Sequence, residues 1–268
     1  MTGFRWRAAI LSTLLAATQA GIAQDSPSNP SGSQPNAAPA EGNFTRETLD
    51  YAIEWRLIPA GTAKFTWGLI PNASSMSELR LHLESAGLVS RLFRVSDDYT
   101  AMLAGQNFCA ESTFMDAHEG SRNRETRITF DQQAHKAAYI EKDKVKNQTT
   151  THDEDIPPCV HDVMGGLMTL RTLHLEPGKT AQIPVTDGKK VALVKVESQR
   201  REDLATPEGI RKTIRYEVFV FDNVLYKRSA HLHIWMTDDN MRLPVQFQVR
   251  LQFAIGTITF RLLKQERS

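Results

Sequence analysis

Apolar and polar residues alternate along much of this chain. In residues 48–57 every second residue is apolar, and after the turn signal Pro59-Ala60-Gly61 the alternation resumes over residues 62–69. A period of two is typical of a β-strand with one buried face, so the two segments predict a hairpin. The apolar residues of this hairpin are Leu49, Tyr51, Ile53, Trp55, Leu57, Ala63, Phe65, Trp67 and Leu69.

The same alternation returns at several places farther along the chain. They are residues 79–83, 126–130, 191–196, 214–220, 232–236 and 243–253. Together they predict about ten or more antiparallel strands with one apolar and one polar face. The last two of these segments predict a hairpin. Their apolar residues share one face if the numbers of paired residues add up to 479, and this register places His231 opposite Gln248.

One segment has helical spacing instead. After Pro157-Pro158, apolar residues recur at Val160, Val163, Met164, Leu167, Leu170 and Leu173. With Asp162 near its start, this spacing predicts one short helix near residues 160–174. Gly165-Gly166 weakens the pattern, since each glycine costs about 1 kcal/mol against alanine. Residues 88–95 fit either a second helix or a strand.

Many strands with little helix predict a mainly β fold, built as a single large antiparallel curled sheet. Such a sheet either closes into a barrel or wraps as a half-barrel around the helix, since open edges invite aggregation. Its apolar face then lines the interior.

The N-terminal segment differs from the rest. Residues 1–23 hold Arg5 and Arg7 before a short apolar stretch and small residues, which is typical of a signal peptide; an uncleaved anchor helix is the alternative. Residues 24–42 are rich in Pro, Ser and Asn and predict a disordered linker. We expect residues 43–268 to form a single domain, with no transmembrane helix in the mature chain and a location in the periplasm after export across the inner membrane.

The net charge of the chain narrows the classes of molecule that it is expected to bind. The chain has 32 Lys+Arg and 31 Asp+Glu, a net charge of +1. Removal of residues 1–23 takes away two arginines and no acid, so 30 basic and 31 acidic groups remain. A near-neutral domain lacks the basic surface that nucleic acid requires, so we expect no nucleic-acid partner.

The sequence has two cysteines, Cys109 and Cys159. In an exported protein they predict a disulfide, which would close a 50-residue loop and contribute roughly 4 kcal/mol. Two buried free thiols are one alternative. A catalytic thiol with His161 is another, although a nucleophile would have to stay reduced after export.

Few residues suggest a metal or cofactor. His231 and His233 have a ligand spacing on one strand face, but the sequence offers no third zinc ligand at a telling distance. The acidic run at residues 152–155 lacks the spacing of a calcium loop, and we interpret it as a solvated loop. Nucleotide, phosphate and hydrolase motifs are missing from the sequence. We therefore expect no metal, no cofactor and no assignable catalytic residue.

Several short motifs carry a resemblance to a known family. They are Leu49-x-Tyr51-x-Ile53-x-Trp55, Ile58-Pro59-Ala60-Gly61, Asp162 with Leu170-Arg171, Glu176-Pro177-Gly178, Ile234-Trp235-Met236 and Arg242-Leu243-Pro244-Val245. In this order they resemble the bacterial envelope family DUF3108 (domain of unknown function 3108), over most of residues 49–263. The family residues are Gly61, Asp162, Arg171, Trp235, Arg242 and Pro244. The resemblance implies an exported antiparallel β protein similar in shape to the half-barrels of periplasmic lipoprotein carriers, and it implies no reaction.

Three functions compete. The first is a non-enzymatic carrier, in which the inward aromatics Tyr51, Trp55, Phe65 and Trp67 line a cavity for a lipid or another amphipathic envelope molecule; the same residues could instead pack against the helix. The second is an envelope scaffold that binds protein or glycan through a polar face made of His231, His233, Trp235, Gln246, Gln248 and Arg250. The third is a hydrolase that uses His231 or His233 with an aspartate or Arg171, although Arg171 is better explained as an anchor between the helix and a sheet carboxylate.

Overall fold

The computed structural model describes residues 45–73, 75–251 and 256–268. The expected signal peptide (residues 1–23), the expected linker (residues 24–42) and the first two residues of the expected domain lie outside the described residues. Within these ranges, fourteen strands form one antiparallel sheet in the order β8-β7-β6-β5-β4-β3-β2-β1-β14-β13-β12-β11-β10-β9. The prediction of a mainly β fold with one large curled sheet is confirmed.

The first eight strands form one continuous half of this order. They are β1 (Arg46–Trp55), β2 (Ile58–Leu69), β3 (Met76–Ser85), β4 (Val95–Ala104), β5 (Cys109–Glu119), β6 (Arg122–Asp131), β7 (Lys136–Asp143) and β8 (Gln148–Asp155). The other half holds β9 (Thr180–Thr186), β10 (Val191–Thr206), β11 (Gly209–Val218), β12 (Ala230–Thr237), β13 (Pro244–Leu251) and β14 (Thr257–Arg267). The halves join where β1 pairs with β14, so the chain enters and leaves the sheet near its middle.

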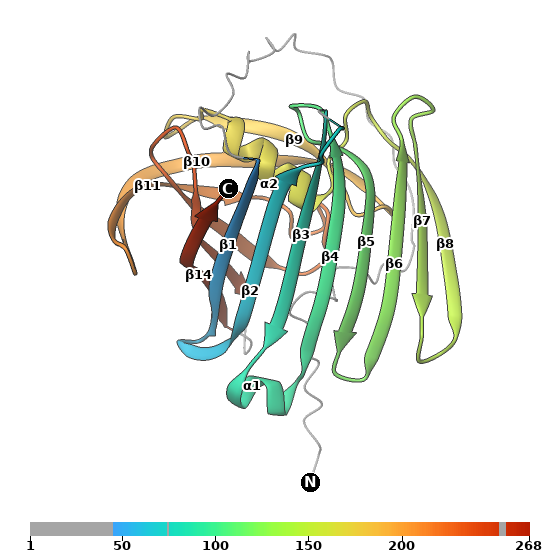
Figure 1. Cartoon of the computed structure of the whole chain (residues 1–268), viewed down its shortest axis with the longest axis horizontal. Coiled ribbons are helices and arrows are strands. Elements are labelled where there is room, and N and C mark those ends of the chain that lie inside the picture. The colour runs from blue at the N-terminus through green and yellow to red at the C-terminus, as the bar shows by residue number, and fades with distance from the viewer. Residues whose placement is uncertain (1–44, 74, 252–255) are drawn as a thin grey trace.

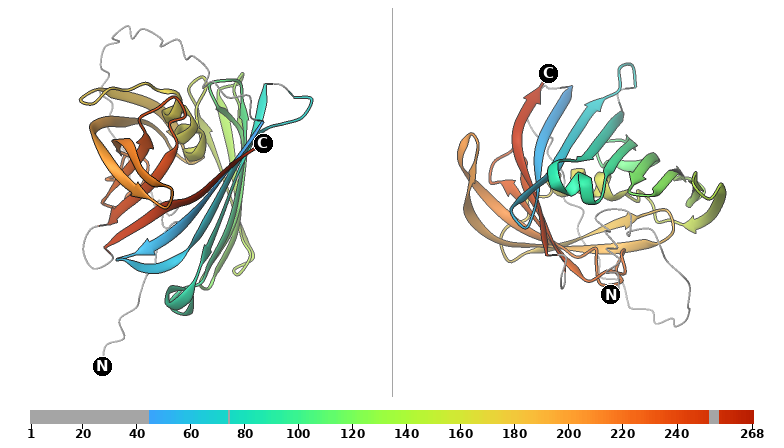
Figure 2. Two further views of the ribbon diagram at one scale, coloured as in Figure 1. Left: turned by 60° about the vertical axis from the view of Figure 1, so that its left-hand side comes forward. Right: turned by 90° about the horizontal axis from the view of Figure 1, so that it is seen from below.

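The sheet curls but does not close. Seen from below, it bends into two layers that meet along the β1–β14 side (Figure 2). The ends of the order, β8 and β9, are not hydrogen-bonded to each other. The fold is therefore an open half-barrel with its apolar faces turned inward.

The described residues also contain two helices, and Figure 1 shows where they lie on the sheet. The predicted helix is α2 (Val163–Thr172), which lies between the two layers at the upper end of the sheet. The segment that fitted either a helix or a strand contains most of α1 (Gly87–Leu92), followed by the first residue of β4. We call the end of the sheet that carries α1 and the β1–β2 turn the lower end.

Two local predictions are wrong. Residues 152–155, expected as a solvated loop, belong to the edge strand β8, in which every residue is exposed or half-exposed. The last hairpin also pairs differently, because the turn after Thr237 folds back only at Leu243 and a bulge follows Trp235. The observed pairs are His231–Arg250, His233–Gln248 and Trp235–Gln246.

Buried apolar residues fill much of the interior. Leu49 and Leu79 are 0% exposed and belong to a cluster under β1–β4 and β13–β14, and a second cluster lies between α2 and β9–β12. The family-motif residue Gly61 is explained by local sterics, since a Cβ at this position would lie 2.1 Å from the Glu84 carbonyl oxygen on β3. The close approach of β2 and β3 therefore requires glycine.

Candidate ligand cavity

The N-terminus of α2 is fixed by a buried capping residue. Asp162 is 2% exposed and accepts hydrogen bonds from the backbone N–H groups of Met164 (2.9 Å) and Gly165 (3.1 Å). The Tyr99 hydroxyl on β4 also donates to Asp162, at the same Oδ2 that accepts from Met164, over 2.6 Å. Burial raises the pKa of Asp162, and these hydrogen bonds partly oppose that rise. The cap thus joins the helix to the sheet.

The glycine pair that weakened the helix prediction has a packing function. A Cβ at Gly165 would lie 2.8 Å from Asp162 Oδ1 and 3.0 Å from the Phe108 carbonyl oxygen. A Cβ at Gly166 would lie 3.2 Å from Val185 on β9. Both glycines therefore let the helix approach the two layers more closely than alanine would allow.

The C-terminal end of α2 is held by an ion pair. Arg171 Nη1 donates to Glu47 Oε2 on β1 at 2.6 Å, and Glu47 is 0% exposed. Arg267 and Gln265 on β14 also donate to this carboxylate. The arginine and hydrogen-bond donors around Glu47 hold its pKa low despite the opposing effect of burial. Arg171 anchors the helix to a sheet carboxylate, as we expected.

A disulfide lies just before the helix. Cys109 at the start of β5 is bonded to Cys159, with their Cα atoms 4.7 Å apart, so the predicted disulfide is confirmed. The catalytic-thiol alternative is wrong, because both sulfurs are bonded. His161 is 5% exposed, its Nδ1 lies 3.0 Å from the Phe108 carbonyl oxygen, and burial lowers its pKa.

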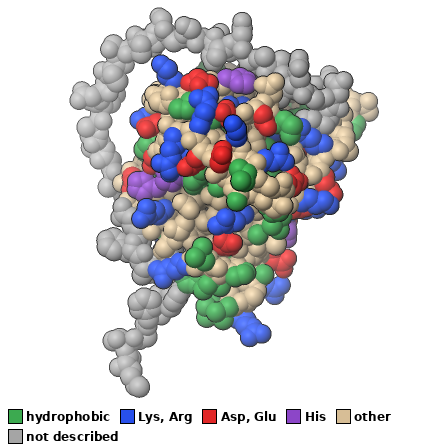
Figure 3. Space-filling view, turned by 90° about the vertical axis from the view of Figure 1, so that its left-hand side faces the viewer, with side chains coloured by type: hydrophobic (Ala, Val, Ile, Leu, Met, Phe, Trp, Pro, Cys, Tyr) green, Lys and Arg blue, Asp and Glu red, His purple; other side chains and the backbone are tan. Residues whose placement is uncertain are grey.

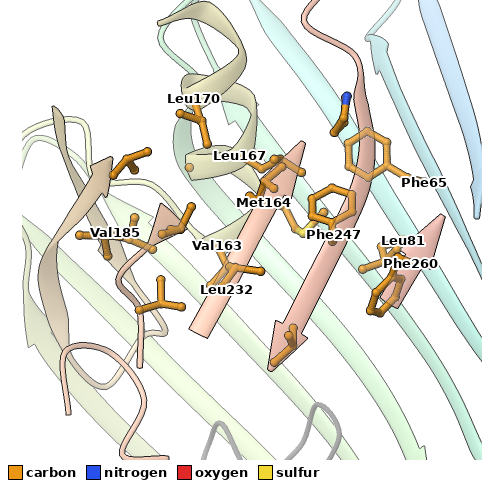
Figure 4. A pocket seen from close by; sticks show the side chains of 18 of the residues that line it. Phe65, Leu81, Val163, Met164, Leu167, Leu170, Val185, Leu232, Phe247 and Phe260 are labelled. Atoms are coloured by element: carbon orange, nitrogen blue, oxygen red, sulfur yellow. The ribbon is translucent and has the colours of Figure 1, made fainter. Parts of the chain in front are cut away.

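Below α2, between the two layers, lies a cavity of about 280 Å³. Figure 4 shows side chains of the helix on one side and of β2, β3, β13 and β14 on the other pointing into it. Val163 lines this space and is 39% exposed, so solvent reaches the interior there. The lining is almost wholly apolar, and its central members are Phe65, Leu81, Met164, Leu167, Leu232 and Phe247.

Few polar groups reach the lining. Arg171 is held by Glu47, and Arg228 comes from the segment between β11 and β12. The Tyr51 hydroxyl donates to the Pro244 carbonyl oxygen at 2.7 Å. The cavity thus offers an acyl chain or a similar apolar group a surface with little competing hydrogen bonding.

The four aromatics expected inside fall into two pairs. Tyr51 and Phe65 line the cavity. Trp55 lies lower, against the small cluster around Leu251, and the Trp67 ring packs against Phe108, with ring centroids 6.3 Å apart. Strand alternation identified the inward face, but the position of α2 decides which inward residues meet open space.

The polar-face residues lie on the outer side of the same strands. Leu232 lines the cavity, so His231 and His233 project from the opposite face. Glu217 Oε1 lies 2.9 Å from His231 Nδ1. Trp235 is only 7% exposed and its indole N–H donates to Glu202 Oε1 at 2.6 Å. The expected glycan-stacking surface is therefore not formed by Trp235, because its ring is covered.

The hydrolase set is not assembled. The histidines lie on the outer face, whereas Arg171 lines the interior. Among the described residues, no three His, Cys, Asp or Glu side chains are placed to hold a metal ion. Neither helix in the described part of the chain is long and apolar enough to cross a bilayer.

Two further family-motif residues stabilise the upper end of the wall. Arg242 is 4% exposed, lies over the Tyr216 ring and donates to the Tyr216 hydroxyl. Pro244 begins β13 opposite a bulge, where its missing N–H costs no ladder hydrogen bond. Sequence patterns did not assign the contact between Arg242 and Tyr216, which are 26 residues apart along the chain.

An open, curled antiparallel sheet around an internal helix, with an apolar cavity beneath it, defines a half-barrel protein with a hollow apolar interior. The chain belongs to the family described as protein of unknown function (DUF3108), whose model matches residues 50–262. The family prediction is confirmed. No functionally curated protein matches the chain.

A solved structure has a similar fold. It is the beta-barrel-like protein of domain of unknown function DUF1849 from Brucella abortus, with a TM-score of 0.50 and 8% sequence identity. The match covers 84% of this chain and 98% of that chain. At this identity the likeness shows the fold alone.

Proposed function

We propose that this protein is a non-enzymatic binding or carrier protein that holds a lipid or another amphipathic envelope molecule in the cavity below α2. The observation that carries the proposal is the open apolar space itself. Protein interiors are packed with few voids larger than a water molecule. Apolar surface that stays in contact with water in this space forgoes about 25 cal/mol per Å² of burial free energy. An apolar ligand would recover part of this free energy.

The structure around the cavity is suited to holding its shape. Asp162 and Arg171 pin α2 at its two ends, and the disulfide holds the segment that leads into it. A preformed site loses less ordering entropy on binding than one that must assemble around the ligand. The pinned helix therefore supports reversible binding of a chain-like ligand.

The proposed place of action is the periplasm, after export across the inner membrane. The Cys109–Cys159 disulfide supports it, because disulfides persist in oxidising compartments. The signal-like residues 1–23 support it from the sequence. Cell fractionation with N-terminal mass analysis tests it: a periplasmic protein that begins near Gln24 is expected, and an intact N-terminus in the cytoplasm would contradict it.

Native mass spectrometry of protein isolated from its own envelope tests the binding role. We expect a bound lipid or amphipathic adduct that is released on denaturation and identified by chromatography. Wild-type protein that is folded but carries no adduct, and that takes up no fatty-acid probe, would overturn the proposal.

A cavity-filling variant makes this test specific. In Leu167→Trp the larger side chain should occupy the space and remove at least nine-tenths of the adduct. The matched control is Leu193→Trp on β10, where the native side chain is 61% exposed and lies outside the lining. Equal adduct in both variants, at equal melting temperature, would count against binding in this cavity.

A further inference from the structure

Large apolar side chains are exposed together at the lower end of the sheet. Leu57 in the β1–β2 turn is 83% exposed, and Ile58 at the start of β2 is 41% exposed. On α1, Leu88 is 58% and Leu92 is 63% exposed. Isolated exposed apolar residues are ordinary, but adjacent ones mark an interaction surface. We call Leu57, Ile58, Leu88 and Leu92 the lower rim.

Backbone contacts hold the lower rim together. The Ala86 N–H donates to the Ala60 carbonyl oxygen at 2.8 Å, which joins the start of α1 to β2. Val89 is 8% exposed and faces the protein, whereas Leu88 and Leu92 are four residues apart on the other helix face. Hydrophobic side chains gather at this lower end in Figure 3. The apolar groups of the rim thus point outward from a fixed scaffold.

The turn residue Leu57 is an unfavourable choice for the backbone. Arg56 and Leu57 have φ angles of 49° and 69°, the left-handed region that two-residue hairpin turns fill with Asn-Gly. Leu57 thus both strains the backbone and exposes apolar surface. Residues that break such rules are expected at functional positions, here a contact with a partner outside the folded chain.

Basic residues lie close to the rim in the chain. Arg91 and Arg94 are exposed, whereas the Arg56 guanidinium lies over the Trp55 ring. The Gly120 N–H donates to the Arg94 carbonyl oxygen at 2.7 Å, which brings the β5–β6 turn alongside. An exposed acid, Glu84, also lies near the rim, with a carboxylate oxygen 3.9 Å from His82 Nε2. Exposed apolar groups beside exposed arginines match the interface of a bilayer that carries anionic headgroups.

The rim lies at the end of the cavity wall. Leu251 lines the cavity, and its N–H donates to the Gly256 carbonyl oxygen at 3.1 Å. Gly256 packs against Arg56, whose N–H donates to the Thr257 carbonyl oxygen at 3.0 Å. A surface in contact with the rim therefore lies next to the lower end of the cavity wall.

We propose that the lower rim docks this protein on an anionic lipid bilayer. Leu57, Ile58, Leu88 and Leu92 enter the boundary between headgroups and acyl chains, and Arg91 and Arg94 pair with lipid phosphates. This docking is independent of whether the cavity carries a ligand, so each proposal can fail without the other.

Vesicle cosedimentation tests the docking, with protein as isolated from cells. The probe is vesicles of phosphatidylethanolamine and phosphatidylglycerol at three to one, compared with pure phosphatidylcholine. We expect at least tenfold stronger binding to the anionic vesicles and a marked loss in 0.5 M NaCl. Absent binding, or equal binding to both compositions, would overturn the proposal.

Matched variants distinguish membrane binding through the lower rim from nonspecific binding by any exposed apolar residue. Leu57→Asn with Leu92→Gln should weaken vesicle binding at least tenfold without loss of folding, since asparagine suits the left-handed turn. Ile210→Asn is the control, because Ile210 is 75% exposed beside the β10–β11 turn; it should leave binding unchanged. Full vesicle binding by the double variant would refute docking through the lower rim. A dimer in solution that the double variant abolishes would assign the rim to self-association instead.

Discussion

The carboxyl group of Asp97 makes the stability of this protein depend on pH. Asp97 lies on β4, is 2% exposed and accepts a hydrogen bond from the His118 N–H at Oδ1 (2.9 Å). Its Oδ2 is buried and has no hydrogen-bond partner among the described residues. Burial, and secondarily the nearby carboxylate of Glu119, raise the pKa of Asp97 from 3.8 to about 7.

The sign of the effect follows from proton binding. Between pH 3.8 and about pH 7 the folded protein keeps a proton on Asp97 that the unfolded chain has lost. The free energy of unfolding therefore falls as the pH rises through this range, and the contribution is constant above it. A tenfold change in proton affinity is worth ~1.36 kcal/mol, so the total loss is on the order of 4 kcal/mol.

Asp97→Asn should remove this loss. The amide oxygen can still accept from the His118 N–H, and no charge is buried at any pH. At pH 8 the variant should be more stable than the wild type by on the order of 4 kcal/mol, and at pH 4 the two should be nearly equal.

Urea unfolding followed by tryptophan fluorescence at pH 4, 6 and 8 measures the difference. Asp98→Asn is the matched control, because Asp98 is exposed and binds His82 Nδ1 at 2.8 Å; it should keep the wild-type fall in stability. The reasoning fails if Asp97→Asn loses stability between pH 4 and pH 8 as steeply as the wild type does.

Three further variants test the supports of the cavity by denaturant or thermal unfolding. Replacing Cys109 and Cys159 by serine should lower the free energy of unfolding by about 4 kcal/mol, as expected for a 50-residue loop; an unchanged urea midpoint would contradict this. Glu47→Ala should cost about 3–5 kcal/mol because it leaves Arg171 buried without its carboxylate, and a cost below about 1 kcal/mol would show that the pair is dispensable. Gly165→Ala should lower the melting temperature despite the better helix propensity of alanine, since the Cβ would collide with Asp162 Oδ1; a stabilised variant would contradict the close approach.

Strand alternation predicted the fold class because most strands bury one face and expose the other. It could not detect β8, since residues 148–155 contain no apolar side chain. It also placed Leu57 on a buried strand face, whereas β1 ends at Trp55 and Leu57 lies exposed in the turn. Alternation reports which face a side chain occupies and carries no information about where a strand stops.

The site was predicted only in outline. The helical positions Met164, Leu167 and Leu170 and the strand residues Tyr51 and Phe65 do line the cavity. The pairing of Arg171 with Glu47 joins residues 124 apart, and no local pattern could identify that carboxylate. A cavity depends on how much space two layers leave between them, which is a property of the whole sheet.

The strand order has a consequence for folding. Strands β1 to β8 and β9 to β14 each pair only with sequence neighbours, except where β1 meets β14, about two hundred residues away along the chain. Closing so long a loop is slow, so each half should form as a meander before the seam zips together. The cavity takes Phe65 from the first half and Phe247 from the second, so it exists only when that last seam has formed.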